Sequence, residues 1–345
     1  AELRSEGVLV RPIGSKARPQ VTGGGAKRKL AQRTAQVLLR GSRHSVPEGV
    51  CPRCRRPVKQ KRHKCTRKSN GEVAAIPMWL RLQTTDENAF REVLTKKVYE
   101  FWTKGFRLED AAVWLDLGAH IGTFACHVLA KGCRVVAFEP QPENFQLLSA
   151  NVAAQRSWPK AEDAGEAILH RAAVVSAARK AACGGRMPLM EHPSERDTYR
   201  HTMLQEMGQR HRKGGSGLQP VSYLARQEPV PVYTLAEALE AYPEVEGVKL
   251  DIEGMEMEVL EEVTDWRGVK RLAFEYSHEY DDSGPRFRKI MDHLRSHFTY
   301  VRPSTRVGIE GDRITIAPAF GFTVVASTDP LKEYSPNVRK CDADM

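Results

Sequence analysis

Two stretches of the sequence carry glycines and carboxylates at the spacing of a nucleoside-binding site. An apolar run from residue 111 ends at Asp116, and Gly118 and Gly122 follow, which predicts a buried strand, a tight turn and a helix. A second apolar run ends at Glu139, 23 residues further along. A carboxylate at that strand end can accept hydrogen bonds from two ribose hydroxyls, and the free amides of the first helix face the same place.

The glycine pattern separates two nucleoside cofactors. Dinucleotide folds use G-x-G-x-x-G to pack backbone against a pyrophosphate, whereas this chain has D-x-G-x-x-x-G with Asp116 at the strand end. A carboxylate there repels phosphate but suits the cationic amino-acid part of S-adenosylmethionine. We therefore favour S-adenosylmethionine over NAD. The alternative is a glycine turn in an ordinary αβ protein, which the position of Glu139 disfavours.

A third stretch places charges at the end of another predicted strand. Lys249, Asp251 and Glu253 alternate with apolar residues, so on a strand their side chains share one face. Glu275 ends the next strand, and we expect it near Asp251 because ligands bind at the carboxyl ends of parallel strands. The alternative is a solvated strand end with an internal Lys–Asp pair. The apolar neighbours disfavour it, because charges beside a core need a partner or a function.

These three stretches together resemble the FkbM-type methyltransferases. The matching segments are 116–124 (DLGAHIGTF), 137–145 (AFEPQPENF) and 249–256 (KLDIEGME), in that order. The resemblance covers about residues 79–327. It implies a class I fold, S-adenosylmethionine as methyl donor and, above all, O-methylation. The chain departs from the family at His120, where Asn is usual, and at 172–176 (AAVVS), where an acidic residue near the adenine is common.

The resemblance also implies roles for individual residues. The first loop would hold the methionine part of the cofactor, Glu139 the ribose, and Pro140 and Asn144 the adenosine side. Asp251 and Glu253 would face the reaction centre, and Glu275 joins them as a catalytic candidate by its strand position. The residues expected in the first loop are Asp116, Gly118, Ala119, His120, Gly122 and Thr123.

Methylation of oxygen is favoured over methylation of a base. The strand that ends near Asp251 is not followed by the Asp/Asn-Pro-Pro-aromatic tetrapeptide expected for exocyclic amines, and no Pro-Cys is placed to attack a pyrimidine. A hydroxyl acceptor must lose its proton, and Asp251 is the best-placed carboxylate to orient it or receive the proton.

Alternating strand and helix patterns predict the elements that position these residues. They indicate an α/β fold with a Rossmann-like, doubly wound, mostly parallel sheet. Thr234 and Glu237 predict a capping box at the start of a short helix. The expected strands are 111–116, 134–138, 168–175, 248–251, 272–275 and 322–326, and the expected helices are 86–102, 123–131, 142–154, 255–263 and 286–298.

Composition and charge divide the chain into unequal parts. Residues 1–70 hold 19 of the 53 Lys and Arg but only three of the 43 Asp and Glu, a net charge of +16 in a chain whose net charge is +10. We expect this arm to contact nucleic acid, RNA in particular, or another polyanion. The expected organisation is an irregular basic tail (1–45), a basic cysteine module (46–70), a methyltransferase domain (71–330) with a long insert or substrate region (176–230), and a C-terminal tail (331–345).

The cysteine module offers four soft or borderline ligands in two close pairs. Their spacing favours a structural tetrahedral Zn²⁺ over reduced surface thiols, with His44 as a substitute for His63. The basic residues around them include no aromatic, which favours phosphate contact over base stacking. The expected zinc ligands are Cys51, Cys54, His63 and Cys65.

The whole sequence excludes several other classes of protein. With 41% hydrophobic and 28% charged residues it is neither collagen, coiled coil nor globally disordered. No apolar run approaches the roughly 18 residues of a membrane span. Seven unevenly spaced cysteines indicate a reducing intracellular compartment, with mitochondrion, plastid or nucleus as candidates. A second reading remains: a methyltransferase-like structural or RNA-binding subunit of a ribonucleoprotein complex, with little or no catalysis.

Overall fold

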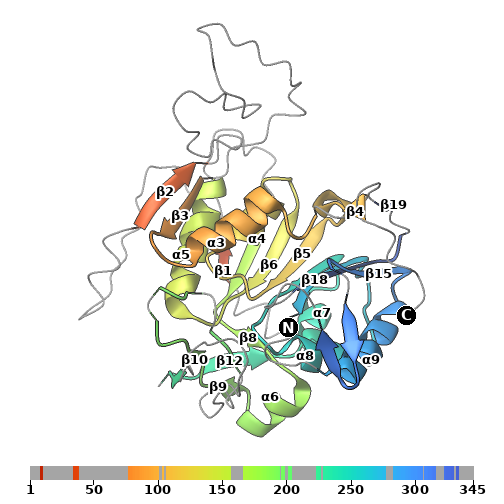
Figure 1. Cartoon of the computed structure of the whole chain (residues 1–345). Coiled ribbons are helices and arrows are strands. Elements are labelled where there is room, and N and C mark those ends of the chain that lie inside the picture. Colours follow the sequence, from red (N-terminus) through yellow and green to blue (C-terminus); the bar gives the residue numbers. More distant parts are fainter. Residues whose placement is uncertain are drawn as a thin grey trace, which may run out of the picture.

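The computed structural model is organised around one eight-stranded sheet (Figure 1). It describes residues 77–100, 106–156, 166–194, 196–198, 201–203, 223–226, 228–276, 283–305, 307–315 and 322–329, and the strands 8–10, 34–38, 103–104 and 332–333. The zinc ligands and most of the basic arm expected from the sequence lie outside these residues.

The central sheet has the order β1-β7-β6-β5-β13-β14-β18-β15. Neighbouring strands from β7 to β14 run parallel, whereas β1, β18 and β15 each pair antiparallel with their neighbours. The strands are β1 (Val8–Val10), β5 (Val113–Leu117), β6 (Arg134–Phe138), β7 (Ala167–His170), β13 (Gly247–Leu250), β14 (Arg271–Tyr276), β15 (Tyr300–Pro303) and β18 (Phe322–Ser327). The expected doubly wound, mostly parallel sheet is therefore confirmed.

Helices cover both faces of the sheet, α4 and α5 on one face and α7, α8 and α9 on the other (Figure 1). The helical elements are α3 (Asp86–Phe90), the π-helix η1 (Arg91–Lys96), the 3₁₀ turn η2 (Leu108–Asp110), α4 (Thr123–Leu129), α5 (Pro142–Arg156), α6 (Ala177–Cys183), α7 (Leu235–Ala241), α8 (Glu256–Glu262) and α9 (Gly284–Arg295).

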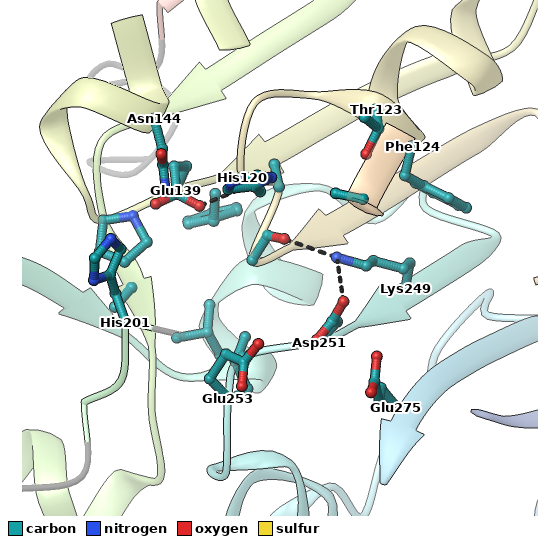
Figure 2. A pocket seen from close by; sticks show the side chains of 18 of the residues that line it. His120, Thr123, Phe124, Glu139, Asn144, His201, Lys249, Asp251, Glu253 and Glu275 are labelled. Carbon is teal, nitrogen blue, oxygen red and sulfur yellow. Dashed lines mark hydrogen bonds and ion pairs between the residues drawn. The ribbon is translucent and has the colours of Figure 1, made fainter. Parts of the chain in front are cut away.

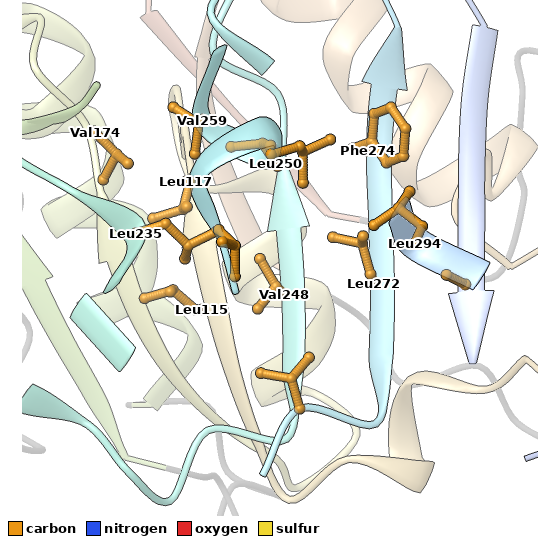
Figure 3. Close-up of a cluster of buried hydrophobic side chains, with 14 of the residues drawn as sticks. Leu115, Leu117, Val174, Leu235, Val248, Leu250, Val259, Leu272, Phe274 and Leu294 are labelled. Carbon is orange, nitrogen blue, oxygen red and sulfur yellow. The ribbon is translucent and has the colours of Figure 1, made fainter. Parts of the chain in front are cut away.

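Side-chain alternation along β5 explains how one strand serves two cores. Leu115 and Leu117 pack with β13, β14 and the helices α7 to α9, as Figure 3 shows. Trp114 points the other way, into the core beneath α4 and α5. All five residues of β5 are buried, as the continuous apolar run predicts for a strand between two helical layers. Asp116 is two residues after Trp114, so its side chain points to the same face of the sheet, toward α4.

Small sheets surround the central one. β12 (Val230–Tyr233) pairs parallel with β8 (Ala173–Val174) and antiparallel with β9 (Arg186–Met187). The two-stranded sheets are β2 (Thr34–Leu38) with β3 (Pro77–Arg81), β4 (Thr103–Lys104) with β19 (Lys332–Glu333), β10 (Met190–Glu191) with β11 (Leu224–Ala225), and β16 (Gly308–Glu310) with β17 (Arg313–Thr315).

Three sequence expectations differ from the structure. The helix expected over 86–102 is α3 followed by a single π-helical stretch, and it ends at Lys97, whose φ of 54° is left-handed. The strand expected over 168–175 is two strands, β7 and β8, which belong to different sheets. The ranges expected to be irregular contain β1 and β2 in 1–45, and α6 and β9 to β11 in 176–230.

The capping box expected at Thr234 is confirmed. Its hydroxyl accepts a hydrogen bond from the amide of Glu237, whose carboxylate accepts one from the amide of Thr234. Among the described helices, none is both long and apolar enough to cross a membrane.

Candidate functional site

One cavity of about 350 Å³ lies at the carboxyl ends of β5, β6, β13 and β14. Its volume is within the ~300–1,000 Å³ typical of small-molecule sites. Figure 2 shows Glu139, Asn144 and His201 on one side, and Lys249, Asp251 and Glu275 on the other. The polar lining comprises Glu92, Tyr99, His120, Thr123, Glu139, Asn144, His201, Lys249, Asp251, Glu253 and Glu275.

Gly118 forms the turn that brings backbone to the cavity wall. Its φ is +76°, and a Cβ on this residue would lie 1.8 Å from the backbone oxygen of Asp251, so only glycine fits. The amides of Gly118 and Ala119 donate to the Phe138 carbonyl at 3.0 and 2.9 Å, which fastens the turn to the end of β6. His120 follows with a left-handed φ of 53°, a conformation that His tolerates better than most residues.

Two residues expected to contact the cofactor lie outside the cavity wall. Gly122 also has a left-handed φ, but its lack of a Cβ makes room for Leu148 of α5. A Cβ at this position would lie 2.6 Å from Cδ1 of Leu148. Asp116 is fully buried behind the wall, where its carboxylate lies 3.3 Å from Nζ of Lys249. Gly122 therefore allows α5 to pack closely, and the carboxylate of Asp116 is paired with Lys249 rather than facing the cavity.

Glu139 presents a buried carboxylate on the side of the cavity formed by β6. Its Oε2 accepts from the amide of His120 at 2.7 Å and its Oε1 from the amide of Gln141 at 2.9 Å. Burial raises the pKa of Glu139, although His120 and these amides oppose the rise. The side chain of Asn144 also hydrogen-bonds this carboxylate. Because a carboxylate has about four acceptor positions, the group is still able to accept from a hydroxyl.

Lys249 is a buried cation that joins the two central strands. Its Nζ lies 3.3 Å from Asp116, 3.5 Å from Asp251 and 2.7 Å from the carbonyl oxygen of Gly118. Lys249 and Asp116 are also register neighbours on β13 and β5. Burial alone would lower the pKa of Lys249, but the charges of Asp116 and Asp251 outweigh it and raise the pKa. The ammonium therefore stays charged and fixes Asp251 at the cavity.

Asp251 is held from a second direction by the N-terminal segment of the domain. The hydroxyl of Tyr99 donates to Oδ2 of Asp251 at 3.1 Å, and Lys249 approaches the same oxygen. Glu275 and Glu92 line the wall beside them. Burial, followed by the charges of Asp251 and Glu92, raises the pKa of Glu275 well above its usual value. The Glu275 carboxyl group is therefore harder to ionise than an exposed glutamate.

The alternation expected for Lys249, Asp251 and Glu253 is only partly correct. β13 ends at Leu250, and Glu253 lies in a turn with a left-handed φ of 56°, although all three still line the cavity. Glu256 holds this turn by accepting from the amides of residues 252 and 254 at 2.8 and 2.9 Å. Burial raises the pKa of Glu256 to about 7.

The side of the cavity beyond Glu139 is mostly apolar. Asn144 lines it, but its amide group donates to the Thr198 carbonyl and accepts from Arg81. Pro140 also lines it, as expected. His201, which comes from the insert, adds a polar side chain here. The apolar lining residues on this side are Ala172, Ala173, Val174, Leu189 and Met203.

Sequence reasoning missed three polar residues that line this cavity. Tyr99 and Glu92 lie in the segment expected to be a regular core helix, and His201 lies in a stretch without periodicity. A signal existed for Tyr99, because a polar hydroxyl on an apolar helix face needs a partner when buried. No comparable signal marked His201. Within the described ranges, no group of three His, Cys, Asp or Glu residues could hold a metal ion.

Comparison with known proteins places this cavity in a family context. No curated protein matches the sequence. Among solved structures the chain is similar to precorrin-6y C5,15-methyltransferase from Geobacter metallireducens GS-15, with 12% identity, a TM-score of 0.34, and 72% of this chain and 93% of that chain covered. It is also similar to an O-methyltransferase from Bacillus cereus in complex with S-adenosylhomocysteine, with 10% identity, a TM-score of 0.27, and 64% and 76% covered.

The family assignment rests on the sequence of the domain itself. A model of the methyltransferase FkbM domain matches residues 116–301, which is more than half of the chain. The matched range contains the Gly118 turn, Glu139 and the Lys249–Asp251 pair that form the cavity. The chain therefore belongs to the FkbM methyltransferase family, whose members are S-adenosylmethionine-dependent enzymes.

Proposed function

We propose that this protein transfers the methyl group of S-adenosylmethionine to a hydroxyl oxygen. One observation carries the proposal: a single cavity has a buried carboxylate, Glu139, at the end of β6 on one side and a carboxylate held by Lys249 and Tyr99, Asp251, on the other. The motif after β13 supports oxygen as acceptor, because Asp251-Ile-Glu-Gly254 lacks the Pro-Pro-aromatic sequence expected for amine methylation.

The residues of the cavity fit this cofactor. Glu139 retains acceptor capacity for a ribose hydroxyl beside the hydrogen bonds that it already accepts. Gly118, Ala119, His120 and Thr123 line the space in which we place the methionine part. The negative charge of Asp251 suits a cationic group. When bound, S-adenosylmethionine supplies an electrophilic methyl group on a sulfonium sulfur.

The chain contributes alignment and a proton acceptor. Tyr99 and Lys249 both engage Oδ2 of Asp251, which leaves Oδ1 for an acceptor hydroxyl as far as the described residues show. An aspartate is a weak base, so we infer that it mainly orients the hydroxyl. It would receive the proton as the oxygen becomes positively charged on bonding to the methyl carbon. Glu253 and Glu275 lie close enough to the same cavity to be the alternatives.

Calorimetry with S-adenosylhomocysteine tests the cofactor site directly. We expect the wild-type protein to bind it and Glu139→Ala to bind it about 1–3 kcal/mol more weakly, because the ribose hydroxyls lose their acceptor. Glu310→Ala, on the hairpin β16–β17, is the matched control and should bind normally. No binding by the wild-type protein would refute the proposed function.

Single-turnover transfer of a labelled methyl group tests the role of Asp251. The acceptor is first found by screening glycosides and RNA with labelled S-adenosylmethionine. We expect Asp251→Asn to lose at least ~100-fold in rate, and the charge-matched Glu253→Gln to lose far less. Normal turnover in Asp251→Asn would move the role of proton acceptor to another carboxylate.

We also propose that the basic arm, residues 1–70, contacts nucleic acid. Its net charge of +16 supports this, because phosphate neutralisation releases counterions. Binding to single-stranded RNA should weaken with salt, and Arg55→Gln/Arg56→Gln should lower the log–log slope by about 1.4. Arg288→Gln/Lys289→Gln removes two exposed charges from α9 and should not change the slope. If the Arg55/Arg56 variant keeps the log–log slope of the wild type, as the Arg288/Lys289 variant should, the result would contradict contact through this arm.

We further propose that the cysteine module binds structural zinc. Its two close ligand pairs support tetrahedral coordination, and we expect about one Zn²⁺ per chain. Metal analysis of reduced protein should find that Cys51→Ser loses this zinc, whereas Cys183→Ser, on α6, keeps it. The assignment would be contradicted if metal analysis finds no zinc in the purified wild-type protein, or if Cys51→Ser holds as much zinc as the wild type. The ligands proposed are Cys51, Cys54, His63 and Cys65, with His44 as the substitute for His63.

A further inference from the structure

A segment of the insert runs across three walls of the cavity. We call the described residues 190–194, 196–198 and 201–203 the strap. The carbonyl of Arg196 accepts from the amide of Thr85, and the carbonyl of Thr198 accepts from the side chain of Asn144, both at 2.8 Å. The hydroxyl of Thr202 donates to the carbonyl of Glu253 at 2.6 Å. The strap is therefore anchored to the segment after β3, to α5 and to the turn after β13.

The strap carries His201 into the cavity in one defined tautomer. Nδ1 of His201 accepts a hydrogen bond from the amide of His192 at 3.2 Å, so a neutral ring carries its proton on Nε2. Burial lowers the pKa of His201 to about 3, and the nearby charges of His120 and Arg81 act in the same direction. At neutral pH His201 therefore presents one N–H donor and no further acceptor.

The surroundings of His201 determine what this donor can reach. Figure 2 shows the ring on the same side of the cavity as Glu139 and Asn144, and on the other side from Asp251 and Glu275. The wall after β7 is apolar on this side, from Ala172 to Val174. The amide group of Asn144 is already engaged by Thr198 and Arg81. Among the described residues that line this apolar wall, His201 is therefore the side chain placed to donate a hydrogen bond to a polar atom of a ligand.

We propose that His201 recognises the purine base of the cofactor by donating Nε2–H to an unprotonated ring nitrogen. The inference rests on the proposed function, because it takes the ribose to lie on Glu139. A base attached to that ribose extends into the apolar side of the cavity, where ring faces can pack on alanine, valine and leucine. The insert then supplies the polar contact that the apolar stretch after β7 does not.

Analogues of S-adenosylhomocysteine test this inference by removing one ring nitrogen at a time. Calorimetry compares the parent compound with its 1-deaza, 3-deaza and 7-deaza forms. In the wild-type protein one analogue should bind about tenfold more weakly than the parent, because the Nε2–H group loses its acceptor. His201→Ala should bind the parent about tenfold more weakly and should bind that analogue as well as the parent.

A second strap variant separates recognition from structural support. His192→Ala keeps the backbone amide that fixes His201 but removes a neighbouring side chain of the same strap. It should retain the wild-type discrimination between parent and analogue, even if both affinities fall. Discrimination that persists in His201→Ala, or that is absent from the wild type, overturns the inference about His201. Failure of the wild type to bind the parent compound overturns the proposed function itself.

Discussion

Replacing Lys249 with methionine tests whether one buried cation organises the cavity. The side chain is 4% exposed and lies 3.3 Å from the fully buried carboxylate of Asp116 and 3.5 Å from Asp251. At an effective dielectric constant of about 20 each attraction is about 5 kcal/mol, much of which offsets desolvation of the ammonium. Removing one partner of such a buried pair costs about 3–5 kcal/mol, because a carboxylate remains buried without compensation.

The assay is urea unfolding of Lys249→Met at pH 7 and at lower pH. Burial already raises the pKa of Asp116, and loss of Lys249 raises it further. The native state then binds a proton that the unfolded state lacks between the two pKa values, so stability falls as pH rises through that window. The deficit of the variant relative to wild type should therefore shrink as pH is lowered from 7 to 5.

Two further variants make the result interpretable. Lys270→Met removes a half-exposed lysine that lies 2.6 Å from Glu246, and should cost about 1 kcal/mol or less. Adding Asp116→Asn to Lys249→Met should restore about 2 kcal/mol or more, since the orphaned charge is gone. A loss in Lys249→Met no larger than in Lys270→Met, with no rescue by Asp116→Asn, would refute the reasoning.

Three other changes probe the same site. Tyr99→Phe should slow single-turnover methyl transfer about tenfold by removing the donor to Asp251, and an unchanged rate would show that Lys249 alone orients the carboxylate. Glu256→Gln should lose less stability than wild type between pH 5 and pH 7, by at most about 1.4 kcal/mol per pH unit. In that window the native Glu256 keeps a proton that the unfolded chain has released, so the stability of the wild type falls as pH rises, and equal pH dependence in both proteins would contradict this. Gly118→Ala should bind S-adenosylhomocysteine at least ~100-fold more weakly, because its Cβ would displace the backbone of Asp251; calorimetry giving wild-type affinity would show that the turn relaxes freely.

The parts of the fold and site that local physics determines could be predicted from sequence. β5, β6, β13 and β14 are short apolar runs, and strands buried on both faces leave that pattern wherever they occur. The positions of the turn at Gly118 and of the carboxylate of Glu139 could be predicted because both residues come directly after such runs. The capping box at Thr234 needs only residues three apart.

The remaining features depend on contacts between distant segments. Tyr99 and Asp251 are hydrogen-bonded although they are 152 positions apart in the sequence, and the sequence around one residue gives no indication of the other. Alternation gives Asp116 and Trp114 the same face, but which helices cover that face is decided only when the sheet assembles. His201 owes its place to the anchors of the strap at Thr85, Asn144 and Glu253, none of which forms a periodic pattern.

The position of β18 has a consequence for how the chain assembles during synthesis. β18 lies between β14 and β15 and pairs antiparallel with both, although it follows them in the chain. Until Phe322–Ser327 has emerged from the ribosome, β14 is an unpaired hydrophobic edge and β15 has no neighbour in the sheet. Such an edge invites pairing with other nascent chains. The half of the sheet that contains β14 is thus the last to become protected, and a chain that stops before Phe322 exposes β14, the strand that carries Glu275.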